Sequence, residues 1–129
     1  MFKQSEYDKR LARDIRRYGS PVYTVEPGII AIGGSYAINV DSQWPASRRY
    51  KPLTTLEIVN NSLADYRVVV NSVTTLFIPH TSQKAWDNLP LAEIILTNTN
   101  ATASAAGEIG ISCNRPAIDA DEIAREKNA

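Results

Sequence analysis

The stretch that decides the fold runs from Thr54 to Cys113 and contains five apolar runs: TTLEIVN (54–60), YRVVVN (66–71), VTTLFIP (73–79), LAEIILTN (91–98) and GEIGISC (107–113). Each run has the length of an ordinary β-strand and is too short for a typical helix. Ile109, Ile111 and Cys113 share one side of the last run, while smaller or polar residues occupy the other. This alternation is typical of a strand with one buried and one solvated face, so the stretch predicts an antiparallel sheet.

Three further extended segments precede this stretch. VYTVE (22–26) and IIAIG (29–33) flank the turn dipeptide Pro27-Gly28, and Gly33-Gly34 leads into YAINV (36–40), which predicts a hairpin or a longer loop. Many short strands joined by turns predict a mainly β protein, either a two-layer antiparallel β-sandwich, with jelly-roll connectivity as one option, or a small barrel. The eight strands are expected at 22–26, 29–33, 36–40, 54–59, 66–70, 73–78, 91–97 and 107–113.

The predicted core is formed by the larger side chains on the apolar sides of these strands. Its members are Val22, Val25, Ile30, Ile32, Tyr36, Ile38, Val40, Leu56, Ile58, Val68, Val70, Leu76, Ile78, Ile94, Leu96, Ile109 and Ile111.

The two ends of the chain differ from this β region. Residues 3–18 are expected to form an amphipathic helix that ends at Gly19-Ser20-Pro21, and residues 1–20 carry a net charge of +3. Residues 117–129 carry a net charge of −2 and can form a short helix from Asp119. The sequence therefore divides into a basic helical arm (1–20), a β-sandwich domain (21–116) and an acidic C-terminal tail or short helix (117–129).

The expected N-terminal helix presents one narrow apolar stripe opposite its basic side. Three hypotheses account for it: the stripe packs on its own β domain, it docks on a neighbouring subunit, or the basic side contacts phosphate or lipid. The charge pattern does not separate them. Under the second hypothesis the subunit-contact residues are Tyr7, Leu11, Ile15 and Tyr18.

A long connection at 41–53, DSQWPASRRYKPL, mixes aromatic and basic side chains. Such side chains can stack on a base or a sugar and pair with phosphate. Alternatively, the connection lies across the β domain, with Trp44 at the edge of the core and the basic groups in water. A carbohydrate-binding module that uses Trp44, Tyr50 and Trp86 is the alternative function. The candidate ligand-binding residues are Trp44, Arg48, Arg49, Tyr50 and Trp86.

Catalytic and metal-binding patterns are not apparent in the sequence, so an enzyme is the least favoured class and no cofactor is expected. His80 is the single histidine, and it lies in HTSQKAWDNLP (80–90), a predicted polar connection, without a partner at a recognisable spacing. Cys113 is the single cysteine and is expected to be a small buried hydrophobic residue. Gly33-Gly34 lacks the surrounding residues of a phosphate-binding loop.

Charge and hydropathy restrict the partners. The formal net charge is zero, so no general attraction to nucleic acid is expected, and no apolar run approaches the length of a membrane span. The first residues, MFKQSEYDKR, lack the apolar core of a signal peptide. The chain is therefore expected to be made in cytoplasm.

Five segments carry a resemblance to a known group of proteins: IVNNS (58–62), VVVN (68–71), FIPHTS (77–82), LAEIILTN (91–98) and AGEIGI (106–111). Their succession resembles small β-sandwich virion structural proteins of tailed phages and related viruses, over residues 54–113. The resemblance implies a non-enzymatic structural role in a capsid, neck or tail. The missing catalytic set and the charged terminal segments, which can act as arms between subunits, predict a homo-oligomer. Such a chain is expected to contact other virion proteins, to be made in the host cytoplasm and to reside in the virion. The resemblance transfers no functional residues.

Overall fold

A computed structural model describes Lys9, residues 18–100 and residues 102–117. In these parts the strands are β1 (Tyr23–Val25), β2 (Ser35–Asn39), β3 (Thr55–Asn60), β4 (Tyr66–Val70), β5 (Thr74–Ile78), β6 (Ser82–Trp86), β7 (Glu93–Asn98) and β8 (Ile109–Asn114). Between β2 and β3 lie the short helix α2 (Val40–Gln43) and the 3₁₀ helix η1 (Pro45–Tyr50).

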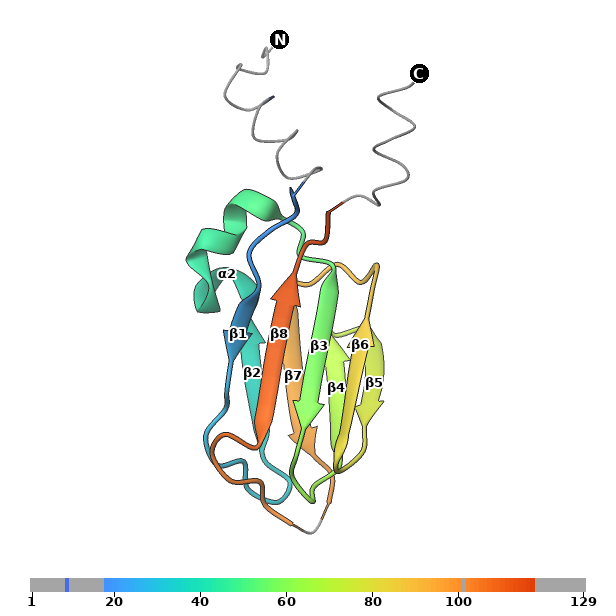
Figure 1. Ribbon diagram of the computed structural model, residues 1–129. Helices are drawn as coiled ribbons and strands as arrows, with labels where there is room; N and C mark the ends of the chain where they lie inside the picture. Colours follow the sequence, from blue (N-terminus) through green and yellow to red (C-terminus); the bar gives the residue numbers. More distant parts are fainter. Residues whose placement is uncertain (1–8, 10–17, 101, 118–129) are drawn as a thin grey trace.

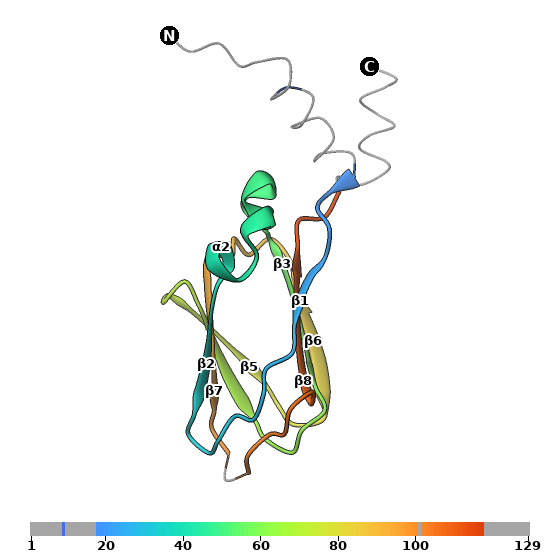
Figure 2. The ribbon, with the colours of Figure 1, turned by 90° about the vertical axis from the view of Figure 1, so that its left-hand side faces the viewer.

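The strands form two four-stranded antiparallel sheets in the orders β1-β8-β3-β6 and β2-β7-β4-β5. Figure 1 shows the first sheet face on, and Figure 2 shows the two sheets as separate layers. The first strand pairs with the last, the second with the seventh, the third with the sixth, and the fourth with the fifth. A long antiparallel hairpin rolled across two layers has this pairing, which is the jelly-roll connectivity. The β-sandwich prediction is confirmed in its jelly-roll form.

The core lies between the two sheets and follows the alternation that the sequence predicts. In β3 the side chains of Leu56 and Ile58 are fully buried, and their neighbours in β8, Cys113 and Ile111, are fully buried as well. Twelve of the predicted core residues are buried: Ile30, Ile38, Val40, Leu56, Ile58, Val68, Val70, Ile78, Ile94, Leu96, Ile109 and Ile111. Three more are only partly buried, at the margin of the core: Val25, Tyr36 and Leu76.

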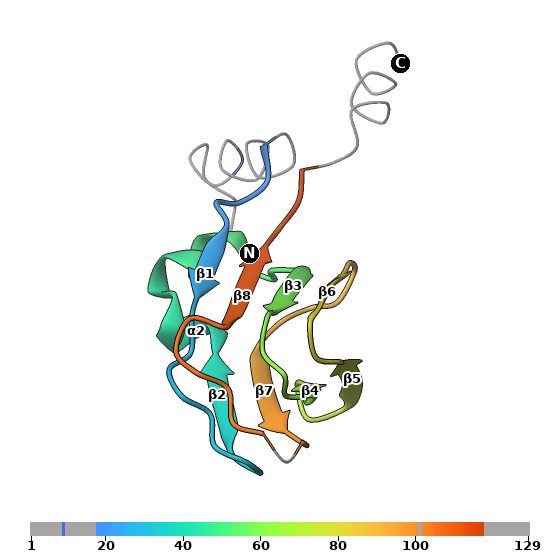
Figure 3. The same cartoon turned by 60° about the horizontal axis from the view of Figure 1, so that its bottom comes forward.

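The predicted strand at 29–33 is wrong. Only Ile30 pairs, through an isolated antiparallel bridge to Ser104, and Figure 3 shows this connection beside the loop between β7 and β8. The segment turns instead: Gly34 N donates to Ala31 O at 2.8 Å, and Gly33 has φ +72°, a conformation that only glycine adopts freely. Ile32, predicted to be buried, is 61% exposed because this turn directs it to solvent, and Val22, before β1, is also exposed.

The predicted polar connection at 80–90 is wrong as well, because it contains β6. This strand pairs with β3 on one side and is an edge strand on the other, so most of its side chains face water and its sequence is polar. Lys84 Nζ donates to the carbonyl oxygen of Phe77 on β5 at 3.3 Å. A charged side chain placed across a sheet edge in this way hinders pairing with a further strand.

The connection at 41–53 is more regular than predicted. Asn39 caps α2 by accepting a hydrogen bond from Ser42 N at 3.1 Å, and Pro45 begins η1. Trp44 lies between the two helices and is buried, with 8% of its surface exposed. The core also contains other residues that the prediction did not include: Leu53, Ala64, Tyr66 and Leu91.

Buried amides organise the loops at the end of the sandwich opposite the termini. Asn60, the last residue of β3, is fully buried. Its Nδ2 donates to Ala64 O at 2.8 Å and to Pro79 O at 3.1 Å. Its Oδ1 accepts from Ser62 N at 3.0 Å and from Ser62 Oγ at 2.6 Å. One side chain therefore joins the β3–β4 loop to the residue that follows β5.

Cys113 is expected to resist thiol reagents while the protein is folded. The side chain is fully buried in β8, and burial raises the pKa of its thiol to about 12. At pH 8 this leaves roughly a thousandfold less thiolate than an ordinary cysteine has. Titration with an aromatic disulfide reagent should give no reaction in buffer and one thiol per chain in urea. Rapid labelling of the native protein would contradict the buried position.

Candidate functional site

Both terminal segments leave the sandwich at one end, above β1 and β8 in Figure 1. Ser20 N donates to Arg115 O at 2.8 Å, and Arg115 N donates to Ser20 Oγ at 2.7 Å. Gly19 approaches so closely that a Cβ atom would collide with the Arg115 carbonyl group. We call this end of the sandwich, which also holds α2, η1, the β4–β5 turn and the β6–β7 loop, the terminal end.

The Arg115 side chain strengthens the same junction. Its Nη1 donates to the carbonyl oxygen of Tyr50, the last residue of η1, at 3.3 Å. The same atom donates to the carbonyl oxygen of the next residue, Lys51, at 2.8 Å. A charged donor makes a stronger hydrogen bond than a neutral one. The point at which the chain enters and leaves the β domain is therefore held by three segments that are far apart in the sequence.

Of the four predicted subunit-contact residues, the structure describes Tyr18. Its side chain is 70% exposed, so the β domain leaves it largely uncovered. The other three, Tyr7, Leu11 and Ile15, lie outside the described residues, as do most of the arm and most of the acidic tail.

The predicted ligand-binding aromatics do not form one platform. Trp44 is buried: its ring centroid lies 6.1 Å from that of Tyr23, and its Nε1 donates to Thr24 O on the edge of β1 at 3.3 Å. The core-edge interpretation therefore applies to Trp44, and its ring face is not available for stacking on a sugar. Tyr50 packs partly against the core. Trp86 lies on β6, at the opposite edge of the sheet from β1.

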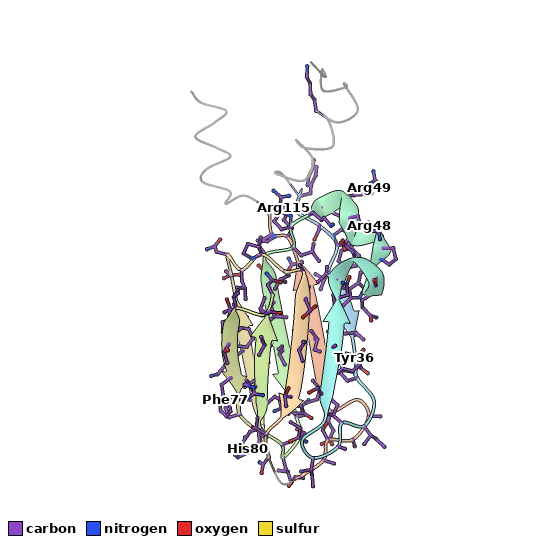
Figure 4. The ribbon with its side chains drawn as sticks, turned by 180° about the vertical axis from the view of Figure 1, so that it is seen from behind. Tyr36, Arg48, Arg49, Phe77, His80 and Arg115 are labelled. Atoms are coloured by element: carbon purple, nitrogen blue, oxygen red, sulfur yellow. The ribbon has the colours of Figure 1, made fainter. Side chains whose placement is uncertain are left out.

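The predicted basic residues remain at the surface of the terminal end. Arg48 and Arg49 are exposed on η1, and Figure 4 shows them near Arg115. Burial and the neighbouring Tyr50 raise the pKa of the Tyr23 hydroxyl, while Arg49 acts in the opposite direction. Arg49 therefore lies close enough to Tyr23 to favour the ionised form of its hydroxyl.

Sequence reasoning missed a pocket at the terminal end. Its volume is about 260 Å³, and three segments line it: α2 with the residues after η1, the β4–β5 turn and the β6–β7 loop. We call it the terminal-end pocket. The only signal in the sequence is that proline and asparagine interrupt these segments, which predicts turns but not their meeting. The lining residues are Asp41, Lys51, Pro52, Asn71, Pro90, Leu91 and Ala92.

The polar groups of the terminal-end pocket are already paired. Lys51 Nζ contacts Asp41 Oδ2 at 2.6 Å across the rim, with the Lys51 side chain 54% exposed. Asn71 Nδ2 donates to Pro90 O at 2.7 Å, and Asn71 Oδ1 accepts from Ala92 N at 2.9 Å. What remains open is mainly apolar surface, bordered by one ion pair.

His80 lies at the opposite end of the molecule and has a partner that sequence reasoning did not find (Figure 4). Its Nδ1 lies 2.8 Å from Asp65 Oδ1, and its backbone N donates to the same oxygen atom at 2.7 Å. His80 is a loop side chain, as predicted. Within the described residues, no group of three or more His, Cys, Asp or Glu side chains could hold a metal ion.

The Asp65–His80 contact predicts acid sensitivity. The backbone and side-chain hydrogen bonds from His80 lower the pKa of Asp65 in the folded protein. The ionised Asp65 therefore stabilises the folded protein fully above its unfolded-state pKa of about 4. This contribution is lost as the pH falls through the folded-state pKa. Urea unfolding should show Asp65→Asn to be less stable than the wild type at pH 5, with the difference narrowing below about pH 4. A difference that stays constant down to pH 2 would contradict this assignment.

Comparisons with known proteins concern the fold. Neither a protein-family model nor a curated protein matches the chain. Among solved structures, the chain is similar to the coat protein of Tobacco streak virus, with 12% identity, a TM-score of 0.43, and 78% of this chain and 88% of that chain covered. It is also similar to a chain in the structure of Tomato aspermy virus, with 11% identity, a TM-score of 0.43, and 93% and 84% covered.

These similarities are distant, and neither structure is named as a tailed-phage protein. At this level of similarity the two structures assign no function to this chain. None of the helices in the described part of the chain has the length and apolar character needed to cross a membrane.

Proposed function

We propose that this chain is a non-enzymatic structural subunit that assembles with copies of itself into part of a virus particle. The observation that carries the proposal is the arrangement of the terminal end. There the hydrogen bonds between Ser20 and Arg115 hold the two segments that enter and leave the jelly-roll domain side by side. The segments beyond this junction carry opposite net charges of +3 and −2.

The exposure of Tyr18 supports a contact between subunits. It is the last residue of the predicted apolar stripe, and 70% of its side chain is open to solvent. Burying a Leu or Ile side chain contributes roughly 1.5–3 kcal/mol, so a stripe that contains Leu11 and Ile15 has enough apolar surface to dock an arm. The opposite charges of the two terminal segments favour correct orientation more than they add affinity.

The virion part of the proposal rests on two further observations. Jelly rolls of eight strands recur in viral capsids, and residues 54–113 resemble virion proteins in their succession of strands and turns. In this proposal the partners are copies of the chain and other virion proteins, and the chain resides in the virion. The carbohydrate-binding alternative is less supported because its aromatic residues are not grouped. Trp44 is buried against the edge of β1, and Trp86 lies on β6, at the opposite edge of the same sheet.

Sedimentation velocity of the full chain at micromolar concentrations tests the proposal. We expect a concentration-dependent series of species heavier than the 14.2 kDa chain. Co-expression with the neighbouring genes should also incorporate the chain into particles that sediment rapidly. A protein that stays monomeric at every concentration and is absent from particles would refute the proposed function.

A further inference from the structure

The terminal-end pocket is formed before any partner binds. Asn71 joins the β4–β5 turn to the β6–β7 loop, and Leu91 N donates to Leu53 O at 2.9 Å. The third wall consists of α2 and the residues after η1, which the ion pair between Asp41 and Lys51 connects. Because these contacts already fix the walls, filling the pocket requires little ordering of the body.

The size and chemistry of the pocket favour apolar side chains. Its volume of about 260 Å³ is below the roughly 300–1,000 Å³ of pockets that enclose a drug-sized ligand. Pro52, Pro90 and Leu91 present apolar surface, whereas the amide of Asn71 is occupied by the loop backbone. The space therefore suits one or two apolar side chains from a protein partner better than a polar metabolite.

The N-terminal arm of a second copy has the matching chemistry and position. Leu11 and Ile15 lie on its predicted apolar stripe, which matches the mainly apolar surface left open in the pocket. The arm enters the body at the terminal end, the same end that holds the pocket. Two copies that meet end to end therefore bring each arm near the other's pocket.

We propose that two copies exchange their N-terminal arms, with Leu11 and Ile15 of each copy in the terminal-end pocket of the other. The inference rests on the proposed function and deepens it, because it names the acceptor surface and the symmetry. An exchange of identical elements is reciprocal, so it forms a closed two-fold contact. The smallest assembly is then a dimer.

Disulfide trapping between two full-length variants tests the exchange. One carries Asp14→Cys, three residues after Leu11 and therefore on nearly the same side of the expected helix. The other carries Ala92→Cys at the pocket. The native Cys113 is not expected to react, because it is buried. Under mild oxidation, a mixture should link residue 14 of one chain to residue 92 of the other, as read by mass spectrometry of digested peptides.

Two controls make the trapping specific. Replacing Ala92→Cys by Asn61→Cys moves the thiol to an exposed site at the opposite end, and at least tenfold less cross-linked product is expected. Separately, Ala92→Trp fills the pocket and should raise the dimer dissociation constant at least tenfold. The same substitution at exposed Ala85, on β6 away from the pocket, should leave that constant unchanged.

The outcomes separate this inference from the proposed function. If oligomers form, but residues 14 and 92 do not link and Ala92→Trp behaves like Ala85→Trp, the pocket is not the acceptor and the exchange is refuted. A third variant carries both cysteines in one chain. If residues 14 and 92 link only within this chain, the arm docks on its own body and the exchange is likewise refuted. If the full chain forms no oligomer and is absent from particles, the proposed function itself fails.

Discussion

Replacing both Leu11 and Ile15 by serine is expected to convert the assembled protein into folded monomers. Each apolar side chain contributes roughly 1.5–3 kcal/mol when it is buried, so the double change removes about 3–6 kcal/mol of docking free energy per arm. An equilibrium constant changes tenfold for every 1.4 kcal/mol, so the loss corresponds to at least a hundredfold in affinity. Sedimentation velocity measures the mass, and circular dichroism reports whether the β body stays folded.

The basic side of the arm provides the matched control. Neutralising Arg13 and Arg16 should affect assembly much less and should mainly change its salt dependence, since exposed ion pairs contribute about 0–1 kcal/mol each. If the double serine variant unfolds the body, the stripe packs on its own core. If that variant assembles normally, the arm is not the contact. If the arginine variant alone loses assembly, the contact is with phosphate or an acidic partner.

Asn60→Ala is expected to lower the free energy of unfolding by about 2–4 kcal/mol. The substitution removes four hydrogen bonds, each contributing roughly 1 kcal/mol, and leaves the buried carbonyl group of Ala64 without this donor. Because Asn60 joins the β3–β4 loop to Pro79, the loss also loosens the end of the sandwich opposite the termini. Urea unfolding followed by fluorescence measures the change.

The neighbouring residue is the control for this prediction. Asn61 is an exposed asparagine whose backbone N donates to Glu108 O at 2.9 Å, a bond that a change of its side chain leaves intact. Asn61→Ala should therefore change the stability by no more than about 0.5 kcal/mol. Equal effects at the two positions would show that the amide of Asn60 has no special role.

The strands of the 54–113 stretch were predictable because burial imposes a visible alternation on them. Leu56 and Ile58 alternate with half-exposed side chains, and the predicted bounds of this strand differ from β3 by one residue. β6 escaped prediction because an edge strand is held by backbone hydrogen bonds while its side chains, such as Gln83, stay polar. Conversely, the apolar run at 29–33 is a loop in which Ile29 and Ile32 are exposed.

The structure of the terminal end could not be predicted from the sequence, because it depends on contacts between residues that are far apart in the chain. Ser20 and Arg115 are 95 residues apart, and no periodic pattern connects them. Asn71 was predicted as a turn residue, but its bonds to the β6–β7 loop depend on the register of β4 with β7. The apolar stripe of the arm stays a prediction from the sequence pattern, whereas the pocket became visible only in the folded structure.

The central position of β8 has a consequence for how the protein is made. β8 lies between β1 and β3, so this sheet stays incomplete until the last strand leaves the ribosome. β3 ends at Asn60 and β8 at Asn114, a gap that takes roughly 3–10 s at ordinary rates of translation. During this interval the edge of β3 is open to strands of other nascent chains. Copies translated together on one message are therefore most prone to mispair just before their final strand emerges.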